Sequence, residues 1–384
     1  MLLIFGAAKL FAEIFERFKQ PGIVGEILAG AIIGPGLLNW IQPNETLTSL
    51  ADLGVMFLLF RVGLEVKSSE LMKVGGTAFL VATTGVIVPF ILGWGILTAW
   101  HHPVKEAVFV GAAMVATSVG ITAQVLAAKG LLHLKSSKII LGAAVIDDIL
   151  GLLVLAVVSS FAKGEVNLVA IATTTFIAAG FTIVLAVWGT RAMGTIVPHV
   201  QKNLHAGEVQ FNLALLFLFA MSVLAIYAGV AAIVGAFLAG MALAETVDRR
   251  VQDLASGVSE LLVPFFLAGI GLKLEFSVFS NPSILLLAIV VLIAAVVSKW
   301  IGCGLGAYSL GRLEMMRIGV GMVPRGEVGM VVAQIGLGMG IIEKPVYAVV
   351  VFMAIMTTIV SPPMITMAFR GAEVKVEEER FQLG

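Results

Sequence analysis

The chain has 384 residues, and its 24 lysines and arginines balance 24 aspartates and glutamates, so the formal net charge at pH 7 is zero. Hydrophobic residues make up 59% of the chain and charged residues only 12%, whereas soluble domains carry about 25% charged residues. This composition excludes an ordinary soluble domain, and the absence of a basic patch argues against nucleic acid as a partner.

Sequence motifs of common enzyme classes are also absent. The chain contains neither a Walker loop nor a nucleophile elbow. Its single cysteine, Cys303, excludes an intrachain disulfide and a cysteine-based metal site. The glycine-rich stretch at 302–307 lies in an apolar run without a preceding strand, so close helix packing explains it better than a dinucleotide-binding loop. We therefore expect a protein that is not an enzyme and has no cofactor.

Apolar stretches of about 20 residues, the length that crosses a hydrocarbon core, recur along the whole chain. The first is amphipathic because it carries Lys9, Glu13, Glu16 and Arg17, and a helix on the membrane surface is the alternative there. We predict an all-α polytopic membrane protein of about thirteen transmembrane helices, at residues 1–18, 21–39, 48–66, 74–100, 104–130, 137–162, 166–190, 208–228, 229–245, 254–272, 282–310, 313–340 and 345–369.

The fifth predicted span contains the sequence ATSVGITA at 116–123, which indicates an interrupted helix. Backbone groups freed at such a break can coordinate an ion. Thr117 and Ser118 lie in the break and offer neutral hydroxyl oxygens. The alternative for both hydroxyls is ordinary bonding to a helix carbonyl of the same turn.

The sixth predicted span carries Asp147 and Asp148 in the motif VIDDILG, inside an apolar run from 139 to 158. On membrane-insertion scales each aspartate costs about 2.5–3.5 kcal/mol there, and ionisable groups at that depth mark a site by default. Their side chains point about 100° apart on a helix, so they need not do the same job. A charge cluster that only positions helices is the alternative.

Lys299 in the eleventh span is the expected partner of one aspartate, because pairing lowers the cost of burying both groups. Snorkelling of the lysine toward the membrane surface is the alternative. A buried carboxylate without a partner is desolvated and holds a proton more readily than an exposed one. A proton and a hard cation such as sodium or lithium then compete for it, which gives exchange if the site opens to one side at a time.

The twelfth predicted span contains a second break, MVPRGEVG at 322–329, where Pro324 and nearby glycines weaken the helix. Interrupted segments at matching places in two halves of a chain are typical of a transport site, with simple kinks as the alternative. Arg325 and Glu327 in this break are secondary candidates, which could bridge helix ends or pair with each other.

The sequence also repeats itself at an offset of about 210 positions. IVGEILAG at 23–30 returns as IVGAFLAG at 233–240, and the similarity covers seven predicted spans. An odd number of spans inverts the second copy relative to the first, an architecture typical of secondary transporters. Chance similarity among apolar segments is the alternative reading.

Lysines and arginines predict the orientation of the chain. With the N-terminus outside and the C-terminus in the cytoplasm, the inner loops and tail hold sixteen of them and the outer loops four, while the remaining four lie inside spans.

VIDDILG, VATSVGITA, MVPRGEVG and QPGIVGEILAGAIIGP together resemble motifs of the cation:proton antiporter superfamily, over essentially the whole chain. The chain most resembles the NapA-like sodium/proton exchangers, which are related to Kef-type potassium-efflux antiporters. The resemblance implies an Na+/H+ antiporter fold with inverted repeats and two discontinuous crossing helices. It implies a dimerisation domain at 1–73 and 208–280, a core ion-translocation domain at 74–163 and 281–370, a linker helix at 164–207 and a cytoplasmic tail at 371–384.

At the matching positions, the resemblance implies that Asp148 is the main carboxylate for ion and proton. Asp147 pairs with Lys299, which can also exchange a proton. Thr117 and Ser118 lie where the unwound helix crosses its partner, near the cation. The paired aspartates and Lys299 resemble electrogenic members, which exchange more than one proton per sodium ion. Kef-type relatives usually carry a glutamine where this chain has Asp147.

We therefore expect a homodimeric secondary antiporter in the inner membrane of a prokaryote, which exchanges sodium or lithium for protons by an elevator movement of the core. Two alternatives remain open: a potassium/proton antiporter of the same fold, and a sodium-coupled symporter of an organic solute.

Overall fold

The computed structural model describes residues 1–18, 20–163, 168–203, 208–273 and 277–383, and all regular secondary structure in this described part is helical. Two short 3-10 helices, Ser277–Ser280 and Tyr308–Leu310, accompany fifteen α-helices. The α-helices are α1 Leu2–Arg17, α2 Gly22–Ile33, α3 Glu45–Leu64, α4 Ser68–Ala99, α5 Val104–Ala113, α6 Val119–Ala128, α7 Lys135–Lys163, α8 Leu168–Asn203, α9 Val209–Tyr227, α10 Ala232–Leu243, α11 Arg249–Leu272, α12 Pro282–Gly306, α13 Arg312–Gly321, α14 Glu327–Gly338 and α15 Lys344–Leu383.

These helices confirm the predicted multi-pass membrane fold. Eight helices of the described part, α3, α4, α7, α8, α9, α11, α12 and α15, are long and apolar enough to cross a membrane. The helices α2, α6 and α10 are apolar but shorter. The thirteen predicted spans follow the same order as the helices when α5 with α6, and α13 with α14, are each counted as one broken span.

The largest differences between the predicted span ends and the structure lie at the C-terminal ends of two helices. The helix α8 continues to Asn203, where the prediction ended at residue 190. The helix α15 continues to Leu383, through the residues that we assigned to a cytoplasmic tail. Residues 373–383 contain no glycine or proline and are rich in glutamate, lysine and arginine, which are good helix formers. The tail is too polar for a membrane span but not for a helix.

The two halves of the chain repeat the same series of helices, α1 to α7 and α9 to α15, with α8 between them. The helices α2 and α10 both have 12 residues, and α5 and α13 both have 10. Gly130 and Gly340, 210 positions apart, both adopt a left-handed backbone, with φ of 65° and 68°, after the second half of a broken span. The inverted repeat predicted from the sequence is thus present in the fold.

Two glycines of the repeated motif explain why that motif returns. Gly30 in α2 faces the backbone carbonyl of Ala268 in α11, and Gly240 in α10 faces the carbonyl of Phe60 in α3. A Cβ atom at either glycine would overlap that carbonyl. Only glycine permits such a backbone-to-backbone crossing, so the same residue is required at both positions.

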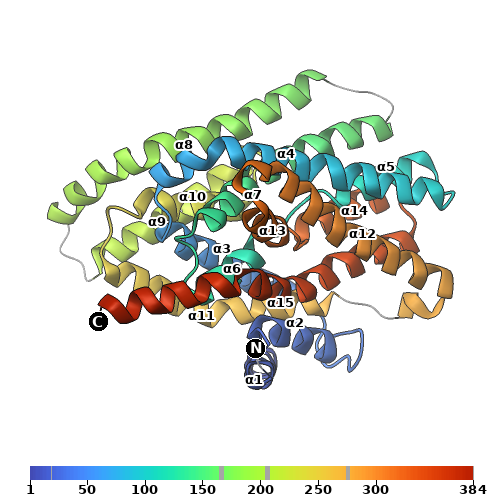
Figure 1. Cartoon of the computed structure of the whole chain (residues 1–384), viewed down its shortest axis with the longest axis horizontal. Helices are drawn as coiled ribbons and strands as arrows, with labels where there is room; N and C mark the ends of the chain where they lie inside the picture. The colour runs from blue at the N-terminus through green and yellow to red at the C-terminus, as the bar shows by residue number, and fades with distance from the viewer. Residues whose placement is uncertain (19, 164–167, 204–207, 274–276, 384) are drawn as a thin grey trace.

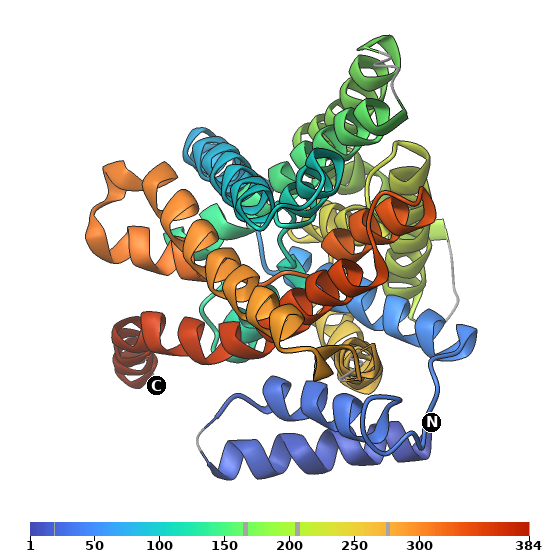
Figure 2. The same cartoon turned by 90° about the vertical axis from the view of Figure 1, so that its right-hand side faces the viewer.

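Contacts between helices fall into two groups. The helices α1, α2, α3, α9, α10 and α11 pack on one another, and α4, α5, α7, α12, α13, α14 and α15 form the second group. The helix α6 contacts α3 of the first group and both α7 and α15 of the second. In Figure 1, α8 lies along one edge of the molecule and α1 and α2 lie along the opposite edge; Figure 2 shows α1 and α2 side by side. The helix α6, the second half of the first broken span, therefore lies at the boundary between the groups.

Candidate ion-binding site

The two helix breaks meet each other in the protein interior. The first break joins α5 to α6 and the second joins α13 to α14. The backbone N–H of Ser118, in the first break, donates to the carbonyl oxygen of Pro324 in the second, at 2.8 Å. The hydroxyl of Thr122 donates to the carbonyl oxygen of Gly321 at 2.6 Å. The discontinuous helices thus cross where the sequence predicted their interruptions.

Each break has a local cause. Pro324 has no N–H to donate within a helix and disfavours helical conformation in the residue before it. Gly326 follows with an extended backbone and is the N-cap of α14. The first break has no proline, but Thr117 and Ser118 offer side-chain oxygens that compete with helical hydrogen bonding. Ser118 is extended and is the N-cap of α6.

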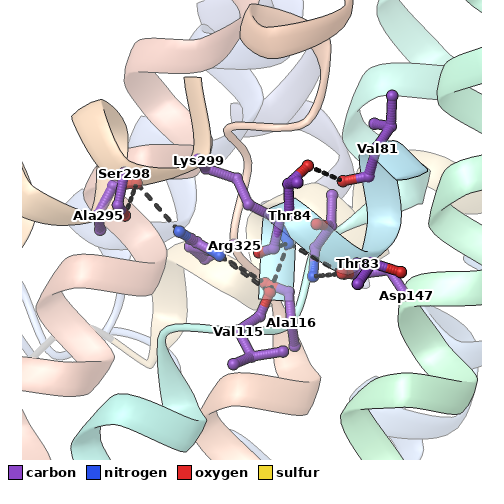
Figure 3. Close-up of polar contacts among 12 residues, drawn as sticks. Val81, Thr83, Thr84, Val115, Ala116, Asp147, Ala295, Ser298, Lys299 and Arg325 are labelled. Atoms are coloured by element: carbon purple, nitrogen blue, oxygen red, sulfur yellow. Dashed lines mark hydrogen bonds and ion pairs between the residues drawn. The ribbon is translucent and has the colours of Figure 1, made fainter. Parts of the chain in front are cut away.

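Asp147 and Lys299 form a buried ion pair at this crossing. The Nζ atom of Lys299 lies 2.9 Å from Oδ1 of Asp147, and both side chains are fully buried. The other carboxylate oxygen, Oδ2, accepts the backbone N–H of Thr117 at 2.9 Å. The structure therefore brings together the two residues that the sequence proposed as partners, and it attaches them to the first break (Figure 3).

The ammonium group of Lys299 uses all three of its N–H bonds. Besides the carboxylate of Asp147, it donates to the carbonyl oxygen of Gly85 in α4 at 2.8 Å and to that of Val115 at 2.6 Å. An ammonium has three donors and no acceptor, so this geometry fits the charged form. One side chain from α12 thus contacts α4, α7 and the end of α5, and snorkelling to the surface is excluded by its full burial.

Arg325 holds the two breaks together from the other side. Its guanidinium donates from NH1 to the carbonyl oxygens of Val115 at 3.1 Å and Ala116 at 3.3 Å, and from NH2 to that of Ala295 in α12 at 3.0 Å (Figure 3). Arg325 is fully buried, and its Nε makes no hydrogen bond within the described residues. Of its two predicted roles, the bridging of helix ends is the one that the described contacts display. The side chain of Glu327 lies outside the described part, although its backbone begins α14.

The carbonyl oxygen of Val115 accepts from both Lys299 and Arg325. It lies just beyond the C-terminal end of α5, where unpaired carbonyl groups give a helix its partial negative charge. Two buried cations are thus placed against that negative end. This arrangement offsets part of the cost of burying them, and the carboxylate of Asp147 offsets more.

Asp148 faces a different environment from its neighbour. It is 8% exposed and lies in the wall of a small apolar pocket between α7 and helices of the other group. The remaining lining residues are Leu59, Val119, Leu141, Val145, Ile233, Val234 and Phe237. The angle of about 100° between successive side chains on a helix accounts for this separation. One aspartate serves the ion pair, and the other lines a pocket at the boundary between the two helix groups.

Thr117 and Ser118 contribute to the crossing mainly through their backbones. The sequence suggested their hydroxyl oxygens as ligands, whereas the structure uses the N–H of Thr117 for Asp147 and the N–H of Ser118 for Pro324. The hydroxyl of Thr117 is buried and makes no hydrogen bond to any described residue. Buried hydroxyls are seldom left without a partner. This oxygen is therefore a chemically reasonable ligand for a cation or a water molecule.

Thr357 and Thr358 in α15 are site residues that our sequence analysis missed. The hydroxyl of Thr357 accepts the backbone N–H of Arg325 at 3.1 Å, and the hydroxyl of Thr358 donates to the carbonyl oxygen of Arg325 at 2.7 Å. They lie 210 positions after Asp147 and Asp148, so the repeat offset was the signal that could have found them. The first copy places carboxylates at these positions and the second places neutral hydroxyls.

The carbonyl acceptors obey the same repeat. Gly85 accepts from Lys299, and Ala295, which lies 210 positions later, accepts from Arg325. The structure thus uses one backbone arrangement twice and fills it with different side chains. Among the described residues no three or more His, Cys, Asp or Glu side chains gather as a metal centre.

Comparisons with known proteins agree with this geometry. The family described as sodium/hydrogen exchanger, transmembrane, matches residues 2–371. The high-affinity Na+/H+ antiporter NhaS3 of Synechocystis sp. is 33% identical, over 99% of this chain and 91% of its own. The Na+/H+-K+ antiporter GerN of Bacillus cereus is 35% identical, over 97% of this chain and 96% of its own.

A solved structure has the same fold. The sodium proton antiporter MjNhaP1 from Methanocaldococcus jannaschii superimposes with a TM-score of 0.72, over 97% of this chain and 95% of that one, at 18% sequence identity. The match to the family over nearly the entire length, together with relatives above 30% identity, confirms the resemblance seen in the motifs. The chain is a member of the sodium/hydrogen exchanger family, within the cation:proton antiporter superfamily.

Proposed function

We propose that the protein is a secondary active antiporter that exchanges sodium or lithium for protons across the inner membrane of a prokaryote. The observation that carries the proposal is the division of labour between two adjacent carboxylates. Asp147 is bound to Lys299 and Thr117, while Asp148 lines a pocket between two groups of helices. The names of the relatives, which describe Na+/H+ antiporters, support the same activity.

In this proposal a sodium ion and a proton compete for Asp148. The pocket around this carboxylate is lined mainly by apolar residues, and in such surroundings a bound proton or metal cation neutralises its negative charge. The hydroxyl of Thr117 and the backbone around Ser118 supply neutral oxygen ligands of the kind that a hard cation prefers. Binding of one ion therefore displaces the other.

Alternating access follows from the position of the pocket. We assign α1–α3 and α9–α11 to the dimerisation domain and the second helix group together with α6 to the mobile core, with α8 as the linker. A core that slides as an elevator would carry Asp148 from one face of the membrane to the other, since the pocket lies on the boundary. Two copies of the chain form a homodimer through the dimerisation domain in this scheme.

One carboxylate accounts for only one proton per sodium ion, which would be electroneutral, so the exchange in this scheme is electrogenic only because a second proton moves. The second proton comes from the Asp147–Lys299 pair, which would open and change protonation during the cycle. That step has to break hydrogen bonds among the three that the ammonium group of Lys299 donates. The resemblance to electrogenic antiporters supports this part of the proposal.

The central test is the substitution Asp148→Asn in proteoliposomes. We expect it to abolish pH-dependent sodium exchange, because an amide side chain has no negative charge to bind a sodium ion and does not exchange a proton. The thermal unfolding temperature should stay close to that of the wild type. Asp253→Asn, at an exposed position of α11, is the matched control and should exchange normally. Normal exchange by the Asp148→Asn protein would disprove the site.

Potassium/proton exchange is the second candidate, because the relative GerN is named as handling potassium as well as sodium. Sodium and potassium ions carry the same charge, so the carboxylates of the described site do not distinguish them by charge. Dequenching of a pH-sensitive dye by added Na+, Li+ or K+, measured over the same concentration range, separates the candidates. A lower half-maximal concentration for K+ than for Na+ would favour the second.

A further inference from the structure

A polar cavity, separate from the apolar Asp148 pocket, lies between α1, the start of α2, the end of α6 and the middle of α15. Its volume is about 540 Å³. Its charged lining residues are Lys9, Glu13, Glu16, Glu26 and Lys129, and Gln20, Gln124 and Thr366 add neutral polar groups. The positive-inside pattern places this face of the molecule in the cytoplasm under the proposed orientation.

Glu26 is the buried charge of this cavity. It lies in the middle of α2 and is 6% exposed. Its Oε1 atom is 3.1 Å from Nζ of Lys9, whereas Oε2 is buried and makes no hydrogen bond to any described residue. The side chain of Lys9 is 46% exposed, so its ammonium remains hydrated. A buried carboxylate with one unused oxygen is costly unless a cation or a water molecule satisfies that oxygen.

The cavity is linked to the Asp148 pocket through α6. Val119, in the first turn of α6, lines the pocket, and Gln124, Val125 and Lys129 further along line the cavity. The five residue steps from Val119 to Gln124 rise by about 7.5 Å along a helix. The Asp148 pocket and the cavity where Glu26 lies are therefore about one and a half turns of α6 apart along its axis.

We propose that Glu26 is a second carboxylate site for a monovalent metal cation, which holds the ion between the cytoplasmic solution and Asp148. The site rests on the proposed function, since it serves the same cation path. Oε2 of Glu26 and the amide oxygen of Gln124 are the protein ligands, and water completes the shell, as hard cations prefer. The negative charges of Glu13 and Glu16 also attract a cation. Glu13 already forms an ion pair with Arg17, in which Oε1 and Nε are 2.9 Å apart. Lys9 and Lys129 oppose the cation, and Lys9 competes with it directly.

The alternative is that Glu26 and Lys9 only tie α2 to α1, and the two readings predict opposite signs. If Glu26 binds the cation, Glu26→Gln raises the half-maximal Na+ concentration on this face roughly tenfold, since it removes a charged ligand. Lys9→Gln then lowers that concentration by roughly threefold, the size expected for a half-exposed ion pair. If the pair is only structural, both substitutions break it and both impair exchange. That same-direction result would overturn the proposal.

Further variants separate the site from general charge effects. Glu13→Gln removes the same charge from the same cavity, but its side chain is 57% exposed, so we expect less than about a twofold change. Glu26→Asp keeps the carboxylate and should recover part of the affinity. Equal effects of Glu13→Gln and Glu26→Gln would show that Glu26 contributes only to the general negative charge of the cavity, and would overturn the proposal.

A binding readout removes the dependence on transport. In the Asp148→Asn protein, whose main site is lost, addition of Na+ should still raise the unfolding temperature, and the added substitution Glu26→Gln should abolish that rise. Loss of the sodium effect in Asp148→Asn alone would overturn the second site. Normal exchange by Asp148→Asn would instead disprove the proposed function, so the two failures are distinguishable.

Discussion

Lys299 shows how a single side chain connects the parts of the site. Its ammonium donates to Asp147, Gly85 and Val115, which belong to three different helices or helix ends. Loss of the ammonium would leave a buried carboxylate without its cation and two buried carbonyl groups without donors. Lys299 therefore stabilises the site whether or not it also carries a transported proton.

The substitution Lys299→Gln is expected to destabilise the protein by about 3–5 kcal/mol, the cost of breaking a buried pair by removing one partner. The double variant Asp147→Asn with Lys299→Gln should recover a large part of this loss, because it no longer buries an uncompensated charge. Thermal unfolding in detergent measures both. A double variant less stable than Lys299→Gln would contradict the pairing.

Lys299→Gln also tests whether the exchange is electrogenic. If the Asp147–Lys299 pair supplies the second proton, Lys299→Gln should exchange one proton per sodium ion and generate no membrane potential. A potential-sensitive dye in proteoliposomes measures this directly. A potential equal to that of the wild type would show that the extra proton comes from another group.

Arg325 acts through a planar fork that a lysine cannot reproduce. We expect Arg325→Lys to retain one of the three carbonyl contacts and to loosen the break at residues 114–118. Amide hydrogen exchange in that segment should rise, while Arg312→Lys, at an exposed position of α13, should leave it unchanged. Unchanged protection in Arg325→Lys would show that the guanidinium is not what holds the break.

At the scale of helices, the two copies of the inverted repeat place different side chains on the same backbone arrangement. The first copy presents Asp147 and Asp148, and the second presents Thr357 and Thr358 at the same offset. Both hold the N–H of a break residue, one with a carboxylate and the other with a hydroxyl. A membrane interior tolerates few buried charges, which accounts for carboxylates in one copy only.

The helix crossings depend on two glycines, and this gives a prediction about stability. Gly30→Ala and Gly240→Ala should each strongly destabilise the protein, because the added Cβ meets a backbone carbonyl rather than a flexible side chain. Gly257→Ala in α11 is the control, since no atom lies within 4 Å of its added Cβ. Its unfolding temperature should stay unchanged or rise slightly. Equal effects at all three positions would contradict the close crossings.

At the scale of the whole molecule, the orientation in the membrane is open to a direct test. Cys303 is fully buried, so Cys303→Ala provides a background without other cysteines. In intact cells a membrane-impermeant maleimide should label Lys344→Cys, on the proposed outer side, and should label Arg312→Cys only after the cells are opened. The reverse pattern would invert the topology inferred from lysines and arginines.

The fold was predictable because the membrane requires it. Backbone groups in hydrocarbon must bond within their own helix, so long apolar stretches could only be helices. The two breaks were visible as Pro324 with Gly326 and as the polar pair Thr117 and Ser118, since such residues weaken helices. The offset of 210 positions indicated the inverted repeat before any coordinates. The end of α15 was missed because hydropathy marks where a span ends and not where a helix ends.

The site was predictable only for groups that are rare in a membrane. Asp147, Asp148, Lys299 and Arg325 were conspicuous because ionisable residues at that depth are expensive. The carbonyl acceptors of Gly85, Val115 and Ala295 were not, since every residue carries a carbonyl group and nothing in the side chain marks which one is used. Likewise, the sequence does not show which of two neighbouring aspartates faces the lysine and which faces the pocket. The packing of α4 against both α7 and α12 brings Asp147 to Lys299 and leaves Asp148 toward the pocket, because a helix turns successive side chains to different neighbours.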